Sequence, residues 1–118
     1  VPTVLEMAFV APWEGIEYRS LVPLLRGDQS AARDAIYGAY TDLQRMLVMD
    51  GFKLIHYPAI EKWLLFHLAN DPWEMHDLSE DPAHAKTLNR LKSHLRTVMH
   101  EMCDPLAEKE DRGVQEKP

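Results

Sequence analysis

The stretch from Leu43 to Pro82 decides the fold, and it reads LQRMLVMDGFKLIHYPAIEKWLLFHLANDPWEMHDLSEDP. It holds short apolar runs at 46–49, 52–57 and 63–68, separated by residues typical of turns. Asp50-Gly51 lies between the first two runs, and this dipeptide is the strongest short-range hairpin signal because both turn residues need a positive φ. The sequence therefore predicts a three-stranded antiparallel meander, followed by a turn and a helix.

A fourth strand is predicted just upstream, where residues 35–40 read AIYGAY. Aromatic and β-branched residues favour strands, and an isolated glycine such as Gly38 marks a bulge or a close backbone approach. A helix over residues 31–40 is the alternative interpretation of the same segment.

From Pro82 to Cys103 the hydrophobic period becomes that of a helix. Ser79 or Asp81 can cap its start, and Pro82 suits a first turn. One apolar stripe is expected to face the sheet: Leu88, Leu91, Leu95, Val98, Met99 and Met102. The predicted fold class is α+β, with a small antiparallel sheet of three to four strands and this C-terminal amphipathic helix packed on one face.

The remaining segments are shorter and less regular. Helical spacing predicts a helix over Val1 to Phe9 and another from Ser20 to Leu25, so residues 1–27 are expected to form linker helices. Residues 35–78 then supply the sheet, 82–103 the helix and 108–118 a charged tail. At 118 residues the whole chain, 1–118, fits one domain.

Composition narrows the function classes. A net charge of −6 gives no electrostatic reason to bind nucleic acid or an anionic membrane. No run of 18 apolar residues is present, so no membrane-spanning helix is expected. The first residues read VPTVLE, with no signal-peptide pattern, and look like a helix already under way. We therefore expect a fragment, and periplasmic, secreted and cytoplasmic locations all stay open.

Histidines and carboxylates are the first candidates for chemistry. His56 and His67 lie on adjacent predicted strands and could face each other, which would allow a small independent hydrolase. No pair of histidines has a recognised metal-ligand spacing, so a structural role is favoured. Asp71, Glu74 and Asp77 are better explained by turns and caps than by paired acid–base catalysis. The sequence thus predicts no catalytic residue and no metal ligand.

Gln44 and Arg45 form the most promising polar pair. They open a predicted strand beside a turn, where side chains can reach a neighbouring site. The alternative is a solvated strand end, and the sequence alone favours that alternative.

Five segments in succession resemble the C-terminal part of a sulfatase. They are PTVLEMA at 2–8, RSLVPLLRG at 19–27, FKLIHY at 52–57, LFHLANDPWEMHDL at 65–78 and the final amphipathic helix. Each segment alone is a weak signal, but their order is specific, and the match runs from Pro2 to about Met102. The resemblance is to the arylsulfatase-like family of the alkaline-phosphatase-like superfamily.

This resemblance implies a sulfuric ester hydrolase that uses a formylglycine, made from a C/S-x-P-x-R motif, and a calcium ion held by Asp and Asn side chains. Neither motif occurs in this sequence. The chain alone is therefore predicted to be inactive and to dock on a catalytic sulfatase domain. There it would line the substrate cleft, with Gln44, Arg45 and Tyr40 as the candidate substrate-binding residues. The alternative is a non-catalytic binding or assembly module that self-associates through its sheet or helix face.

Overall fold

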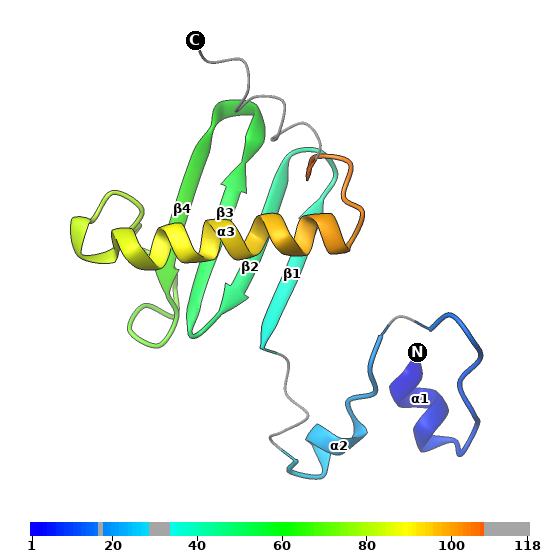
Figure 1. The fold of residues 1–118 in the computed structure, drawn as a ribbon. Helices are drawn as coiled ribbons and strands as arrows, with labels where there is room; N and C mark the ends of the chain where they lie inside the picture. The colour runs from blue at the N-terminus through cyan, green and yellow to red at the C-terminus, as the bar shows by residue number, and fades with distance from the viewer. Residues whose placement is uncertain (17, 29–33, 108–118) are drawn as a thin grey trace. The chain divides into compact units, whose positions relative to one another are not determined.

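The computed structural model describes residues 1–16, 18–28 and 34–107. The chain divides into two compact units, residues 1–33 and residues 34–118, which are described separately below. Figure 1 shows the elements of each unit. The predicted charged tail, 108–118, lies outside the described residues.

The N-terminal unit contains two short helices, α1 (Pro2–Met7) and α2 (Val22–Leu25), at the two places where the sequence predicts helices. Its long-range tie is a hydrogen bond of 3.0 Å from the Leu21 amide to the Thr3 hydroxyl. Of the described residues in this unit, only Val22 is buried. Its large apolar side chains are mostly exposed: Val1, Val4, Met7, Phe9, Val10, Trp13, Tyr18, Leu21 and Leu25.

The second unit is built on a four-stranded antiparallel meander of β1 (Ala35–Tyr40), β2 (Gln44–Met49), β3 (Phe52–Tyr57) and β4 (Lys62–His67). The predicted hairpin is confirmed, because Met49 pairs with Phe52 across Asp50 and Gly51, whose φ angles are 52° and 76°. The strand predicted at 35–40 is confirmed as β1, and the helical alternative is wrong.

Gly38 also has its predicted close approach. A Cβ atom at this position would lie 3.0 Å from Cε of Met46, its partner on β2. Because the Met46 side chain lies across Gly38, a larger residue there would have to displace it.

Two 3-10 turns, η2 (Pro58–Ile60) and η3 (Pro82–His84), precede β4 and the helix α3 (Ala85–Glu101). Asp81 provides the predicted cap, since its carboxylate accepts a 2.9 Å hydrogen bond from the Ala83 amide. In Figure 1, α3 crosses one face of the sheet. The predicted α+β fold is therefore confirmed.

The core lies between α3 and this sheet face. Leu47, Leu54 and Leu65 are paired in register across β2, β3 and β4 and form its centre. They are fully buried, as are three residues of the predicted helical stripe, Leu91, Leu95 and Met99. Met102 was wrongly assigned to the stripe: α3 ends at Glu101, and the Met102 side chain is exposed.

The segment after β4 closes the free edge of that strand. The Asp71 carboxylate accepts hydrogen bonds from the amides of Met75 and His76, at 3.0 and 2.8 Å. Asp77 accepts one from the Leu65 amide at 3.0 Å, and the Leu78 amide donates to the Leu65 carbonyl at 2.8 Å. The predicted turn roles of Asp71 and Asp77 are confirmed. The bonds from Asp77 and Leu78 to Leu65 protect an edge of β4 that is otherwise open to pairing with another strand.

Candidate functional site

The turn between β1 and β2 carries the residues that the sequence singled out. Tyr40 pairs with Gln44, and the Leu43 amide donates a 3.1 Å hydrogen bond to the Tyr40 carbonyl. Thr41 has a φ of 47°, which lets the chain reverse within three residues. Because side chains alternate along a strand, Tyr40 and Gln44 lie on the sheet face away from α3, and Arg45 lies on the α3 face.

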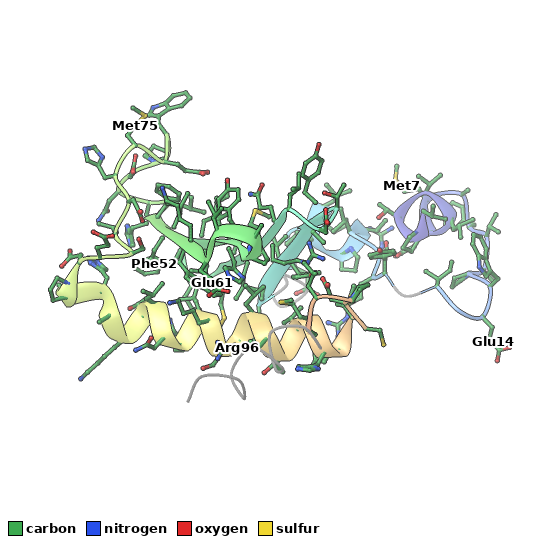
Figure 2. All side chains as sticks on the ribbon, turned by 90° about the horizontal axis from the view of Figure 1, so that it is seen from above. Met7, Glu14, Phe52, Glu61, Met75 and Arg96 are labelled. Atoms are coloured by element: carbon green, nitrogen blue, oxygen red, sulfur yellow. The ribbon has the colours of Figure 1, made fainter. Side chains whose placement is uncertain are left out.

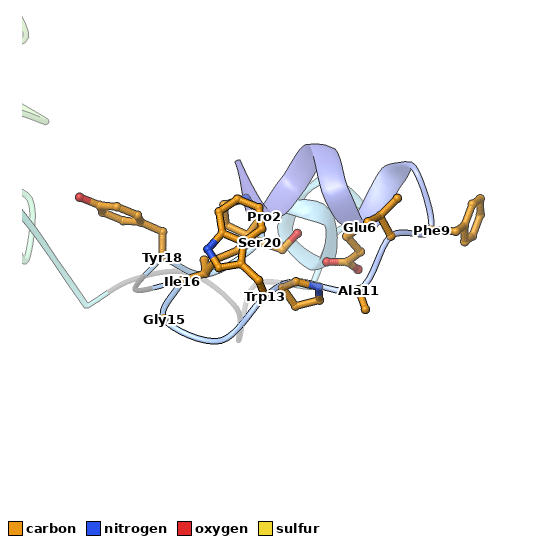
Figure 3. Close-up of a pocket in the computed structure, with 11 residues that line it drawn as sticks. Pro2, Glu6, Phe9, Ala11, Trp13, Gly15, Ile16, Tyr18 and Ser20 are labelled. Carbon is orange, nitrogen blue, oxygen red and sulfur yellow. The ribbon is translucent and has the colours of Figure 1, made fainter.

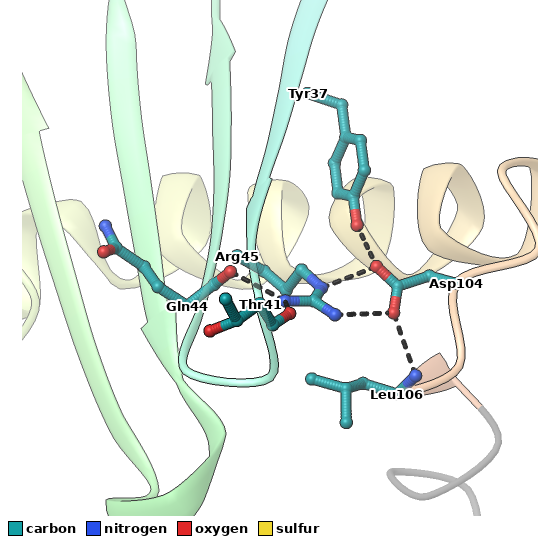
Figure 4. Close-up of polar contacts among 6 residues, drawn as sticks. All are labelled: Tyr37, Thr41, Gln44, Arg45, Asp104 and Leu106. Atoms are coloured by element: carbon teal, nitrogen blue, oxygen red, sulfur yellow. Dashed lines mark hydrogen bonds and ion pairs between the residues drawn. The ribbon is translucent and has the colours of Figure 1, made fainter.

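Arg45 is only 3% exposed, and its guanidinium is held on both sides (Figure 4). Nε and Nη2 donate to the two carboxylate oxygens of Asp104 at 2.5 and 2.9 Å. Nη1 donates to the carbonyls of Thr41 and Gln44, both at 2.8 Å. Arg45 therefore ties the β1–β2 turn to the segment that follows α3.

Asp104 is the centre of this buried cluster. The Tyr37 hydroxyl donates to Oδ2, and the Leu106 amide donates to Oδ1 at 2.9 Å. Burial alone would raise the pKa of Asp104, but the hydrogen bonds from Arg45, Tyr37 and Leu106, with the Arg45 charge, lower it to about 2. Burial and the neighbouring Asp104 carboxylate raise the pKa of Tyr37. The cluster therefore holds a buried ion pair at neutral pH.

The structure thus brings Tyr40 and Gln44 together at one corner of the sheet and turns Arg45 away from them. Tyr40 is exposed and Gln44 is half-buried. Sequence analysis missed Tyr37 and Asp104, which lie 67 residues apart in the chain. No local pattern marks either residue, so only the fold reveals the cluster.

His56 and His67 do not face each other, so the less favoured alternative of a site between them is wrong. In the β3–β4 register His56 pairs with Trp63, and Phe52 pairs with His67, so the two histidines lie at opposite ends of the strands. The ring of His56 stacks on Trp63 at 3.6 Å, and that of His67 meets Phe52 edge-on at 4.5 Å. Both histidines pack against aromatic rings, which supports structural roles.

The N-terminal unit has a shallow pocket of its own (Figure 3). Its walls are mostly apolar and include Pro2, Trp13 and Ile16, with the Glu6 carboxylate and the Ser20 hydroxyl among the lining groups. No hydrogen bond between the Glu6 and Ser20 side chains is seen among the described residues, so they do not form a base–nucleophile pair, and two such groups are too few for a metal-ligand set. The pocket therefore supports no specific chemistry.

The comparisons with known proteins agree with this architecture. The family described as N-sulphoglucosamine sulphohydrolase, C-terminal, matches residues 1–101. The chain belongs to this family. The resemblance to the C-terminal part of a sulfatase is thereby confirmed. No match to a curated protein was found by sequence.

Solved structures show the same fold. A 2-O GAG sulfatase is 24% identical with a TM-score of 0.74, over 87% of this chain and 24% of its own. A protein in complex with its substrate D-glucosamine-2-N,6-O-disulfate is 26% identical with a TM-score of 0.75, over 88% of this chain and 24% of its own. A phosphonate monoester hydrolase of Agrobacterium radiobacter is 22% identical with a TM-score of 0.63, over 85% of this chain and 24% of its own. The sulfatase-family chain thus spans about a quarter of each relative.

The resemblance to sulfatases implies a calcium ion in the complete enzyme. Within residues 1–16, 18–28 and 34–107, no three His, Cys, Asp or Glu side chains gather closely enough to hold an ion. The same part of the chain contains no helix long and apolar enough to cross a membrane. The described carboxylates therefore do not form a calcium site.

Proposed function

We propose that this chain is a supporting, non-catalytic part of a sulfatase, which docks on the catalytic domain and lines its substrate cleft. The family match over residues 1–101 is the observation that supports this most strongly. The sheet and α3 share a core within one unit, which suits a platform for another domain. The formylglycine and calcium of the complete enzyme would then be supplied by the catalytic domain.

The proposed substrate class is a sulfated sugar. The family description and the relative bound to D-glucosamine-2-N,6-O-disulfate both name sulfated glucosamine chemistry. Hydroxyl and amide groups suit such ligands because they can donate and accept hydrogen bonds with sugar hydroxyls and sulfate oxygens. The exposed Tyr40 hydroxyl and the Gln44 amide are groups of this kind.

Within the cleft wall, Tyr40 and Gln44 are the proposed contact residues and Arg45 is a positioning residue. All three Arg45 nitrogens are engaged with Asp104 or with the turn carbonyls. Arg45 would therefore act on substrate through the shape of the β1–β2 turn, which it fixes from the α3 side.

The test uses the polypeptide encoded by the complete reading frame that contains these residues. In it, Tyr40→Phe should raise KM for a sulfated glucosamine by about fivefold, as the loss of one hydrogen bond predicts. Hydrolysis of a small aryl sulfate, which does not reach the wall, should be unchanged. Tyr18→Phe is the matched control, because Tyr18 is equally well exposed but lies in the other unit.

The 118-residue chain alone should give no turnover of aryl sulfate with calcium above the buffer blank. Turnover by the chain alone would contradict a supporting role. Equal KM values for Tyr40→Phe, Gln44→Ala and the unmodified enzyme would instead show that these two residues do not contact the substrate.

A further inference from the structure

The sheet face turned away from α3 is unusually apolar. Strand alternation and register place the following residues on it: Ile36, Gly38, Tyr40, Gln44, Met46, Val48, Lys53, Ile55, Tyr57, Lys62, Leu64 and Phe66. Only Gln44, Lys53 and Lys62 carry an amide or a charge. An antiparallel sheet with one solvated face normally alternates apolar and polar residues. These strands are instead apolar on both faces, as in a sheet that is covered on both sides.

A loop extends this apolar face at its β4 end. Lys53 Nζ bonds both carboxylate oxygens of Glu74 at 2.8 Å, so the one charge in the middle of the face is already neutralised. The chain neighbours of Glu74, Trp73 and Met75, are 83% and 74% exposed. Figure 2 shows Met75 on the opposite side of the sheet from α3.

The exposed residues Trp73 and Met75 lie in a turn that is held by hydrogen bonds. The Asp71 carboxylate accepts from the amides of Met75 and His76, and these bonds lower its pKa. The turn is therefore held in the conformation that presents Trp73 and Met75 to the outside. We call Trp73, Met75 and the residues of the sheet face opposite α3 the open face, leaving out Ile55 and Phe66, which are each only 7% exposed, and Tyr40 and Gln44, which are the proposed substrate contacts.

The solvent side of α3 is different. After Ala85 at its start, its exposed positions are polar or charged, as expected for a surface in water: Lys86, Asn89, Arg90, Ser93, Arg96, Thr97, His100 and Glu101. The sheet–helix unit thus has one face suited to solvent and one suited to a further apolar layer.

We infer that the open face packs against the catalytic part of the sulfatase and is the surface through which this chain is docked. The inference rests on the proposed function. The solved relatives are about four times as long as the region they share with this chain, which covers 24% of two of them. A catalytic part on the same polypeptide has a high effective concentration and would cover the face before a second copy could.

Methionine oxidation can test this directly, because the chain carries its own controls. Met75 is 74% exposed on the open face, Met102 is 51% exposed beyond α3, and Met99 is fully buried. In the isolated 118-residue chain, dilute peroxide should convert Met75 and Met102 to sulfoxides and spare Met99. In the complete polypeptide the rate at Met75 should fall by about tenfold, since oxidation follows exposure of the sulfur, and the rate at Met102 should not change.

The outcomes are distinguishable. Unchanged oxidation of Met75 with new protection of Met102 or Met7 would show that the chain docks through a surface other than the open face. That result would contradict the inference but not the proposed docking. No protection anywhere would overturn both the inference and the proposed function. Protection of Met75 in the isolated chain that grows with its concentration would identify a second copy as the occupant and contradict the assignment to the catalytic part.

A pair of matched variants tests the same surface independently. Ile36 and Met102 are 54% and 51% exposed, so Ile36→Lys and Met102→Lys should both leave the thermal unfolding of the isolated chain nearly unchanged. In the complete polypeptide, Ile36→Lys should restore rapid oxidation at Met75, and Met102→Lys should not. Continued protection of Met75 in Ile36→Lys would contradict the inference.

Discussion

The two units of the chain differ in how they are stabilised. Residues 34–107 enclose a core in which Leu47, Leu54, Leu65, Leu91, Leu95 and Met99 are fully buried. The described part of residues 1–33 buries only Val22 and exposes aromatic and aliphatic side chains. The two units therefore depend differently on their surroundings.

The energies of side-chain burial and of helix formation show how far the two units differ in stability. Each fully buried leucine contributes about 1.5–3 kcal/mol by transfer from water. Helix α1 has six residues, and isolated helices shorter than about 12 residues are marginal in water. We therefore expect the second unit to fold by itself and the first to need an apolar surface to pack against. In the proposed enzyme, that surface belongs to the catalytic domain.

The largest expected effect in the second unit is at the buried ion pair. Asp104→Asn would leave the Arg45 guanidinium charged, buried and without its carboxylate, and should lower the free energy of unfolding by about 3–5 kcal/mol. Urea denaturation of the isolated chain measures this. Arg90→Ala is the control, because the Arg90–Asp50 pair of 2.6 Å is half exposed and its loss should cost about 1 kcal/mol or less.

The same pair predicts how stability depends on pH. The pKa of Asp104 is lowered from 3.8 to about 2 on folding, so its contribution is fully present above pH 4 and is lost as the pH falls toward 2. A shift of this size corresponds to about 2 kcal/mol. The stability difference between the unmodified chain and Asp104→Asn should narrow over this interval. A difference that is constant down to pH 2 would show that the carboxylate is not held ionised.

A matched pair of variants compares the two units directly. Leu91→Ala removes a fully buried side chain and should cost about 2–5 kcal/mol. Leu25→Ala removes an exposed side chain from α2 and should change the unfolding free energy by less than about 0.5 kcal/mol. Equal losses for the two variants would indicate that the N-terminal unit shares in the cooperative core.

Local patterns explain how much of this fold the sequence predicted. Asp50-Gly51 fixes a hairpin through its own φ angles, and the leucines of α3 recur at the helical period, so neighbours in the chain carry the signal. The buried Arg45–Asp104 pair joins residues 59 positions apart, and no local sequence pattern marks either residue as part of an ion pair. Arg45 was therefore identified as notable, but its carboxylate partner became visible only in the structure.

Local sequence patterns also could not predict how much of each unit is buried. The segments at 1–9 and 20–25 have helical spacing like that of α3, yet spacing does not reveal whether a surface is there to receive the apolar side. The predicted substrate-binding roles of Tyr40, Gln44 and Arg45 stay predictions, because they depend on the cleft of a complete enzyme.

Amide hydrogen exchange on the isolated 118-residue chain tests the central contrast most directly. We expect strong protection in β2, β3 and α3, which surround the core, and exchange near the unprotected rate in residues 1–16 and 18–28. Protection in α1 and α2 comparable to that in β3 would contradict this expectation. It would show that the N-terminal unit is stable without a catalytic domain to cover it.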